Sequence, residues 1–89
     1  MAATFTLTVI TPTKIVFQGP VVSMIAPCQY GYLGVLAHHA SLVAHMVPGD
    51  ITVRKADGQE LVLKTHEGGF LGVKNNEASV LLHSIGEVA

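Results

Sequence analysis

Hydrophobic and polar residues alternate along most of the chain. In residues 4–10, TFTLTVI, the side chains of Phe5, Leu7 and Val9 share one face and three threonines share the other. A period of two residues is typical of a strand with one buried face. The same alternation predicts six further strands, over residues 14–18, 21–26, 51–55, 60–66, 69–74 and 78–84.

Turn-forming residues separate these predicted strands. Gly19-Pro20 stands between the second and the third, and Pro48-Gly49 precedes the fourth. Asp57-Gly58 and Asn75-Asn76 tolerate the positive φ angles of tight turns, so we expect each of the last two pairs of strands to form a hairpin. Many short strands with turns between them, and no convincing helical period, predict an all-β antiparallel sandwich or barrel.

Length and composition limit the possible roles of the chain. Its 89 residues are enough for one domain, which we place at 1–89. Only five residues are Lys or Arg and the net charge is −1, so the chain lacks the basic surface that nucleic-acid binding requires. The apolar runs are far shorter than the ~20 residues that cross a bilayer, so we expect no insertion into a membrane.

Charged residues are confined to one half of the sequence. Residues 1–49 contain one Asp, Glu, Lys or Arg, which is Lys14, and residues 50–89 contain the other ten. A domain this small leaves part of every strand at its surface, so the first half should form an uncharged exposed patch. Such a patch indicates contact with another macromolecule, and Tyr30 and Tyr32 suit its centre. The alternative is a free monomer that Thr, Ser, Gln and His make polar enough.

Candidate catalytic and metal-binding residues are sparse. Adjacent residues of an extended chain point to opposite faces, so His38 and His39 do not converge on one metal ion. No serine lies in a Gly-x-Ser-x-Gly turn, and no glycine-rich segment opens a helix that carries a lysine. Cys28 stands alone and fits a small apolar filler better than a reactive thiol. We therefore expect no enzyme activity, no resident metal and no cofactor.

Four segments together resemble the epsilon subunit of F-type ATP synthases. The run GYLGVLAHHASLV, residues 31–43, is similar to the family signature Gly-x-Leu-Gly-Ile/Val-Leu-x-x-His-Ala-x-Leu. The runs FTLTVITPTKIVFQGPVVSMIAP, VPGDITVRKADGQE and GGFLGVKNNEASVLL follow the family pattern in the same order. The resemblance covers residues 4–83.

The resemblance implies both a fold and a role. The family has an amino-terminal β-sandwich of about ten strands, followed by a pair of helices. The sandwich binds the gamma subunit and the polar loops of the membrane c-ring, and it catalyses nothing. The chain would then be a rotor subunit of a proton-translocating ATP synthase, held peripherally at the cytoplasmic face of the plasma membrane.

The matching positions imply two contact sets. The residues that would face the gamma subunit are Thr11, His39, Ala40, Ser41 and Leu42. The residues at the tip that would touch the c-ring are Gln29, Tyr30, Gly31, Tyr32 and Leu33. Family members commonly carry acidic residues at this tip, so the contact here would depend on tyrosine burial and hydrogen bonds instead of charge.

The end of the sequence departs from the family pattern. The chain stops at Ala89, so we expect neither the helical pair nor the restraint of ATP hydrolysis that those helices provide. A replacement of Ala40 or Leu42 by Asp should abolish gamma binding while the domain stays folded.

A second function also fits the residues, namely a small metal- or ligand-binding β-barrel that uses His38, His39 and His66.

Overall fold

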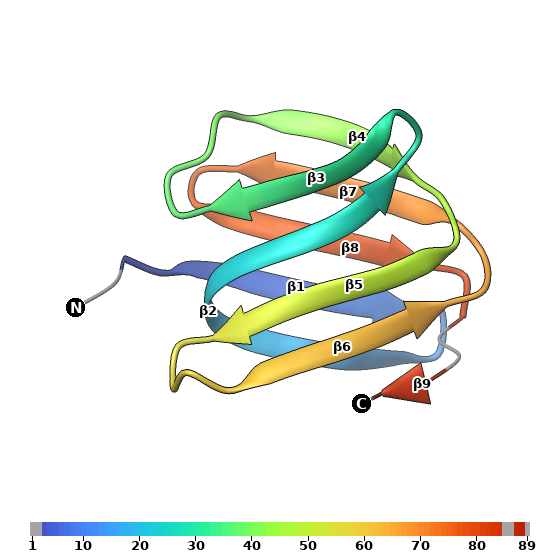
Figure 1. Ribbon diagram of the computed structural model, residues 1–89, viewed down its shortest axis with the longest axis horizontal. Coiled ribbons are helices and arrows are strands. Elements are labelled where there is room, and N and C mark those ends of the chain that lie inside the picture. The colour runs from blue at the N-terminus through green and yellow to red at the C-terminus, as the bar shows by residue number, and fades with distance from the viewer. Residues whose placement is uncertain (1–2, 85–86, 89) are drawn as a thin grey trace.

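The computed structural model describes residues 3–84 and 87–88, and these form an all-β sandwich (Figure 1). The fold class predicted from the alternation is confirmed, with nine strands in the described residues instead of about ten. The strands are β1 (Phe5–Thr11), β2 (Lys14–Cys28), β3 (Gly31–Leu36), β4 (Leu42–Met46), β5 (Gly49–Lys55), β6 (Glu60–Thr65), β7 (Gly69–Lys74), β8 (Glu77–Leu82) and β9 (Glu87–Val88).

The strands form two packed layers that share β2. One layer has the order β3–β2–β5–β6–β9 and lies in front in Figure 1. The layer behind it has the order β4–β7–β8–β1–β2. All these pairs are antiparallel except β1–β8, which is parallel. A short pairing of Cys28 with Met46 joins the layers again at one corner.

The long strand β2 corrects one prediction. Residues 14–18 and 21–26 were expected as separate strands, but Gly19-Pro20 lies inside one 15-residue strand. Up to Val21 the strand pairs with β1, and from Val21 onward it pairs with β5, where the register shifts. A proline lacks an N–H, and here Pro20 lies at the change of partners, with its carbonyl accepting a hydrogen bond from Ala56 N. The dipeptide therefore allows the strand to change layers without ending it.

Three strands were not predicted. In β3 and β4 the outward positions include Tyr32, Leu36 and Val43, all exposed. Apolar side chains on both faces remove the alternation by which the other strands were found. The third, β9, lies beyond the last predicted strand and pairs with β6.

Both predicted hairpins are confirmed. Strands β5 and β6 are joined by a turn in which Gly58 has φ 91° and Gln59 N donates to Asp57 Oδ1 at 2.9 Å. Strands β7 and β8 are joined by Asn75 and Asn76, with φ angles of 52° and 61°. Positive φ at both central positions matches the twist of the flanking strands.

The hydrophobic core lies between the two layers and receives side chains from β1 to β8. Full burial of an aliphatic side chain stabilises the fold by about 1.5–3 kcal/mol before entropy costs. The largest fully buried side chains are Leu7, Met24, Met46, Ile51, Leu63 and Leu71.

Candidate docking surfaces

The second function considered above, a metal-binding β-barrel, would need its histidines to converge on one ion. His38 and His39 lie in the loop between β3 and β4, and not in extended chain as the sequence argument assumed; His38 has φ 62°. His38 N donates to Asn76 Oδ1 at 2.8 Å, and His39 Nδ1 lies 2.8 Å from the carbonyl oxygen of Ala40. Within residues 3–84 and 87–88, no group of three His, Cys, Asp or Glu side chains could hold a metal ion.

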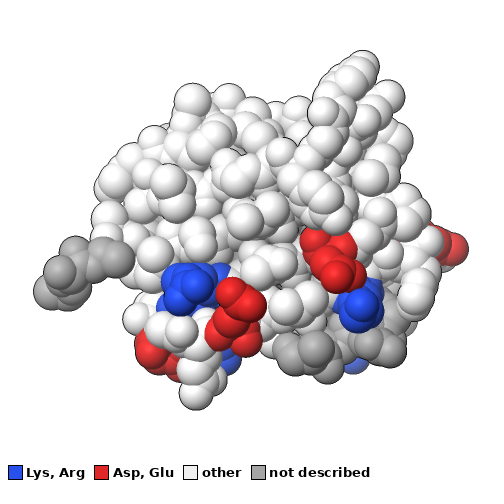
Figure 2. All heavy atoms as spheres, viewed as in Figure 1, with Lys and Arg blue, Asp and Glu red and all other residues white. Residues whose placement is uncertain are grey.

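Most of the charged side chains visible in Figure 2 gather over β5 and β6, one acidic group lies at the right-hand edge, and the upper part of that view shows none. On the outer face of these two strands, Arg54 and Glu60 lie 3.7 Å apart, and Lys64 and Asp50 lie 3.6 Å apart. Exposed pairs of this kind contribute less than about 1 kcal/mol each, so they keep the face hydrated more than they stabilise the fold. The upper part of this view is the uncharged patch that the sequence predicts.

The outward side chains of the other layer form a second surface, which is uncharged except at one edge and which we call the β7 face. Strand register places His45 of β4 opposite Phe70 of β7, Phe70 opposite Leu81 of β8, and Leu81 opposite Ile10 of β1. The ring centroids of His45 and Phe70 are 5.1 Å apart, and the rings are nearly parallel. The result is an apolar row that crosses four strands, with Phe70 54% and Leu81 50% exposed.

A second row, made mostly of small side chains, runs beside this apolar row on the β7 face. It consists of Val43, Gly72, Ser79 and Thr8, which lie opposite one another in register. Val43 is 83% exposed, and the space over Gly72 is open. The first charged pair on this face comes only at its edge, where Lys74 lies opposite Glu77.

The structure brings together four of the five residues expected to face gamma. His39, Ala40 and Ser41 lie in the β3–β4 loop, and Leu42 begins β4. Asn76 fixes this end of the sandwich, since its side chain accepts from His38 N and donates to the carbonyl of Thr4.

Thr11 is the residue of this set that the structure places elsewhere. It pairs with Lys14 at the far end of β1, a strand of seven residues that spans about 20 Å. Thr11 and the β3–β4 loop therefore lie at opposite ends of the layer that carries the β7 face.

The burial of Leu42 corrects the proposed test. Its side chain is half-buried and packs against the hydrophobic core, so an Asp at this position would disturb folding as well as docking. Ala40 is exposed, and Val43, the next residue along β4, points outward. A charge at either position tests docking alone.

The five residues of the expected c-ring contact do lie together, at the tip of the β2–β3 hairpin. Gly31 has φ 121°, which favours glycine, and Tyr30 beside it is 96% exposed. Backbone hydrogen bonds hold the tip against β4: Gln29 N donates to the carbonyl of His45 at 2.9 Å, and Val47 N donates to that of Pro27 at 3.0 Å.

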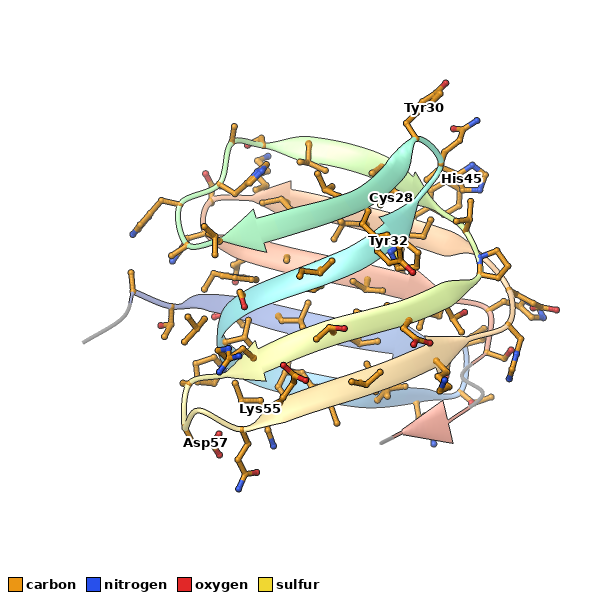
Figure 3. The ribbon with its side chains drawn as sticks, in the orientation of Figure 1. Cys28, Tyr30, Tyr32, His45, Lys55 and Asp57 are labelled. Carbon is orange, nitrogen blue, oxygen red and sulfur yellow. The ribbon has the colours of Figure 1, made fainter. Side chains whose placement is uncertain are left out.

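Beside the tip is a hollow of about 350 Å³, which we call the tip hollow. In Figure 3, Tyr30 projects away from the body of the molecule, while Cys28, Tyr32 and His45 lie below it. The hollow is lined by Cys28, Gln29, Tyr30, Gly31, Tyr32, Leu33, Val43, Ala44 and His45.

Sequence reasoning missed three exposed residues of these surfaces, namely Val43, His45 and Phe70. The signal was present, because a run of apolar residues with a histidine precedes the Pro48-Gly49 turn. For Val43 and His45 it was not used because β4 was not predicted as a strand, so no outward face could be assigned to these residues. Phe70 lies on a predicted strand, but its neighbours on the sheet depend on pairings that the sequence did not specify.

Cys28 is half-buried in the tip hollow, and burial raises the pKa of its thiol above the ordinary value. The thiolate is the nucleophile, so Cys28 should react slowly near neutral pH. We expect alkylation by iodoacetamide at pH 7.5 to be several-fold slower in the folded chain than in urea, and to accelerate as the pH rises. Mass spectrometry of the alkylated fraction measures both rates. Equal rates in the two states would contradict the prediction.

The sequence of the chain is similar to those of one known family of proteins. Residues 4–87 match the family described as the ATP synthase delta/epsilon chain, β-sandwich domain. The ATP synthase epsilon chain of Dichelobacter nodosus is 37% identical over 81 residues, which are 91% of this chain and 56% of the relative. That of Leptospira interrogans is 41% identical over 75 residues, 84% of this chain and 58% of the relative. The chain thus spans a little over half the length of these relatives.

Two solved structures share the fold. A chain in the mitochondrial ATP synthase assembly of Euglena gracilis, containing OSCP, F1 and the c-ring, aligns with a TM-score of 0.87 and 24% identity over 97% of this chain and 54% of its own length. A chain in the central stalk and c-ring of the Tetrahymena thermophila mitochondrial ATP synthase aligns with a TM-score of 0.70 and 15% identity over 99% of this chain and 67% of its own. In the described residues of the present chain, no helix is long and apolar enough to cross a membrane.

Proposed function

Because the chain belongs to the delta/epsilon chain family of ATP synthases, we propose that it is a non-catalytic subunit of the central stalk. In this role it binds the gamma subunit and the loops of the c-ring, and so couples rotation of the ring to ATP synthesis in a proton-translocating enzyme. It lies at the cytoplasmic face of the energy-coupling membrane as a peripheral part of the complex.

The observation that carries this proposal is the separation of charge on the surface. The β7 face and the tip carry exposed apolar side chains, including Val43, Phe70 and Tyr30. The Arg54–Glu60 and Lys64–Asp50 pairs lie on β5 and β6. Depletion of charge with exposed aromatic residues is the pattern of an interface centre. Burial of 800 Å² of mostly apolar surface would contribute on the order of 20 kcal/mol before the costs of association, and only the surplus over those costs appears as affinity.

The gamma contact is assigned to the β7 face together with the β3–β4 loop. Ala40 and Ser41 are exposed at one end of this layer, and Thr11 lies at the other. A partner that extends about 20 Å across the sheet would meet all three, which reconciles the five implied residues with their separation.

The ring contact is assigned to the tip. Gln29 to Leu33 form one compact projection, and Tyr30 at its end is almost fully exposed. A tyrosine supplies a large apolar area and one hydroxyl, which suits the polar loops expected on the ring.

Binding to purified gamma subunit and to purified c-ring tests the proposal. The chain should form a stoichiometric complex with gamma in size-exclusion chromatography, and the gamma complex should bind the ring in detergent. A folded chain that binds neither partner would overturn the proposed function.

Replacement of Tyr30 by alanine should weaken ring binding about thirtyfold, because truncation of a central interface tyrosine typically costs about 2 kcal/mol. Titration of the ring by fluorescence anisotropy gives the change. Tyr30→Phe is the matched control. It should retain most of the affinity for the c-ring if the buried area of the aromatic side chain is the main contribution. Gamma binding should be the same in both variants. A Tyr30→Ala variant with wild-type ring affinity would remove the tip from the contact.

A further inference from the structure

The tip hollow is uncharged on every side that faces His45. Strand β7 presents Phe70, whose ring stacks on the imidazole. The end of β2 and the following turn present Cys28 and Gln29, and β3 presents Tyr32. Thus no Asp, Glu, Lys or Arg is among the described residues that line the hollow.

The carboxylate nearest to Phe70 along the chain is occupied elsewhere. Glu67 precedes β7, and its Oε2 lies 3.4 Å from Nε2 of His83, which follows β8. The remaining titratable groups beside His45 are the Cys28 thiol and the phenols of Tyr30 and Tyr32. None of these supplies a negative charge near neutral pH, because burial raises the pKa of the Cys28 thiol and tyrosine phenols are ordinarily neutral there.

We propose that the tip hollow takes up an uncharged side chain from a c-ring loop, and that this contact requires His45 to be neutral. The inference rests on the proposed function and names a regulation of the same site. A volume of about 350 Å³ is enough for one large side chain, and the residues that line the hollow are apolar or uncharged polar ones.

The physical basis is the hydration of the imidazolium. In the free chain His45 is exposed, so water reaches its ring, which stacks on that of Phe70. An inserted side chain would remove this water without offering a carboxylate in exchange. An uncompensated buried charge is strongly unfavourable, so binding expels the proton.

The sign of the pH effect follows from this proton release. Histidine side chains change charge between pH 5 and 8, with an ordinary midpoint near 6.5. Above that range the contact forms with full affinity. Below it each bound complex must displace one proton, so the dissociation constant should rise about tenfold between pH 7.5 and 5.5.

The test measures ring binding by the gamma complex across this pH range for the wild type, His45→Gln and His66→Gln. Glutamine at 45 stays neutral, so the tenfold rise should disappear from that variant. His66 is exposed, and it is not among the residues that line the hollow, so His66→Gln should keep the full rise. Because the ring is the same in all three titrations, its own ionisable groups cancel in the comparison.

Two failures are distinguishable. If the wild type does not bind the ring at any pH, the proposed function itself is overturned. If the wild type binds but His45→Gln shows the same pH dependence, the proton-sensitive contact is overturned and the proposed function stands. Thermal unfolding of each variant at both pH values verifies that the compared chains are folded.

Discussion

Replacement of Gly69 by alanine should lower the free energy of unfolding by about 3 kcal/mol or more, which is a large part of the ~4–13 kcal/mol expected for a domain of this size. A methyl group on Gly69 would overlap the carbonyl oxygen of Leu81 and lie 3.1 Å from its carbonyl carbon. These are backbone atoms of the paired strand β8, so they cannot move without breaking the β7–β8 ladder. Urea denaturation followed by circular dichroism measures the loss.

Gly72 provides the matched control on the same strand. No atom lies within 4 Å of the position that its methyl group would take. Gly72→Ala should therefore change the free energy of unfolding by less than about 0.5 kcal/mol, as at an ordinary surface site. If the two variants were equally stable, close approach of the strands at Gly69 would not constrain the fold.

Strands with one buried apolar face and one polar face could be predicted from the sequence, and strands that are apolar on both faces could not. In β1 the alternation of Phe5 and Leu7 with threonines corresponds to the alternation of buried and more exposed side chains. In β3 and β4 the outward residues Tyr32 and Val43 are apolar in large part as well, as the proposed docking contacts would require. The failure of the alternation is thus itself a feature of the candidate docking surface.

The sequence also predicted which contact residues lie together only where they are consecutive. A motif that is continuous in sequence, such as Gln29 to Leu33, stays together because one hairpin holds it. Thr11 and Ala40 came from separate motifs, and their placement at opposite ends of a layer depends on strand pairings that no local pattern specifies. The apolar row through Phe70 and Leu81 depends on three registers at once, so it emerged only from the structure.

Replacement of Val43 by aspartate should weaken gamma binding by at least a hundredfold while the domain stays folded. Val43 is 83% exposed and lies beside the open space over Gly72, so water hydrates the new carboxylate in the free chain. Once gamma covers the β7 face, the carboxylate loses this water, and the residue directly opposite it in register is Gly72, which offers no cation. An unpaired buried charge costs about 3–5 kcal/mol. Isothermal titration with gamma measures the loss. The variant's stability should change by no more than about 1 kcal/mol, since strand preference alone differs.

Ile25→Asp is the control for this prediction. Ile25 is also an exposed β-branched residue in a paired strand, but it lies on the outer face of the other layer, opposite Gly34 and Thr52. Its replacement should leave gamma affinity within about twofold of the wild type, as for a surface change outside the contact. The reverse result, with Ile25→Asp defective and Val43→Asp normal, would move the gamma contact to the layer of β3, β2 and β5. Equal losses in both variants would indicate a general defect in the sandwich, which the unfolding measurements would reveal.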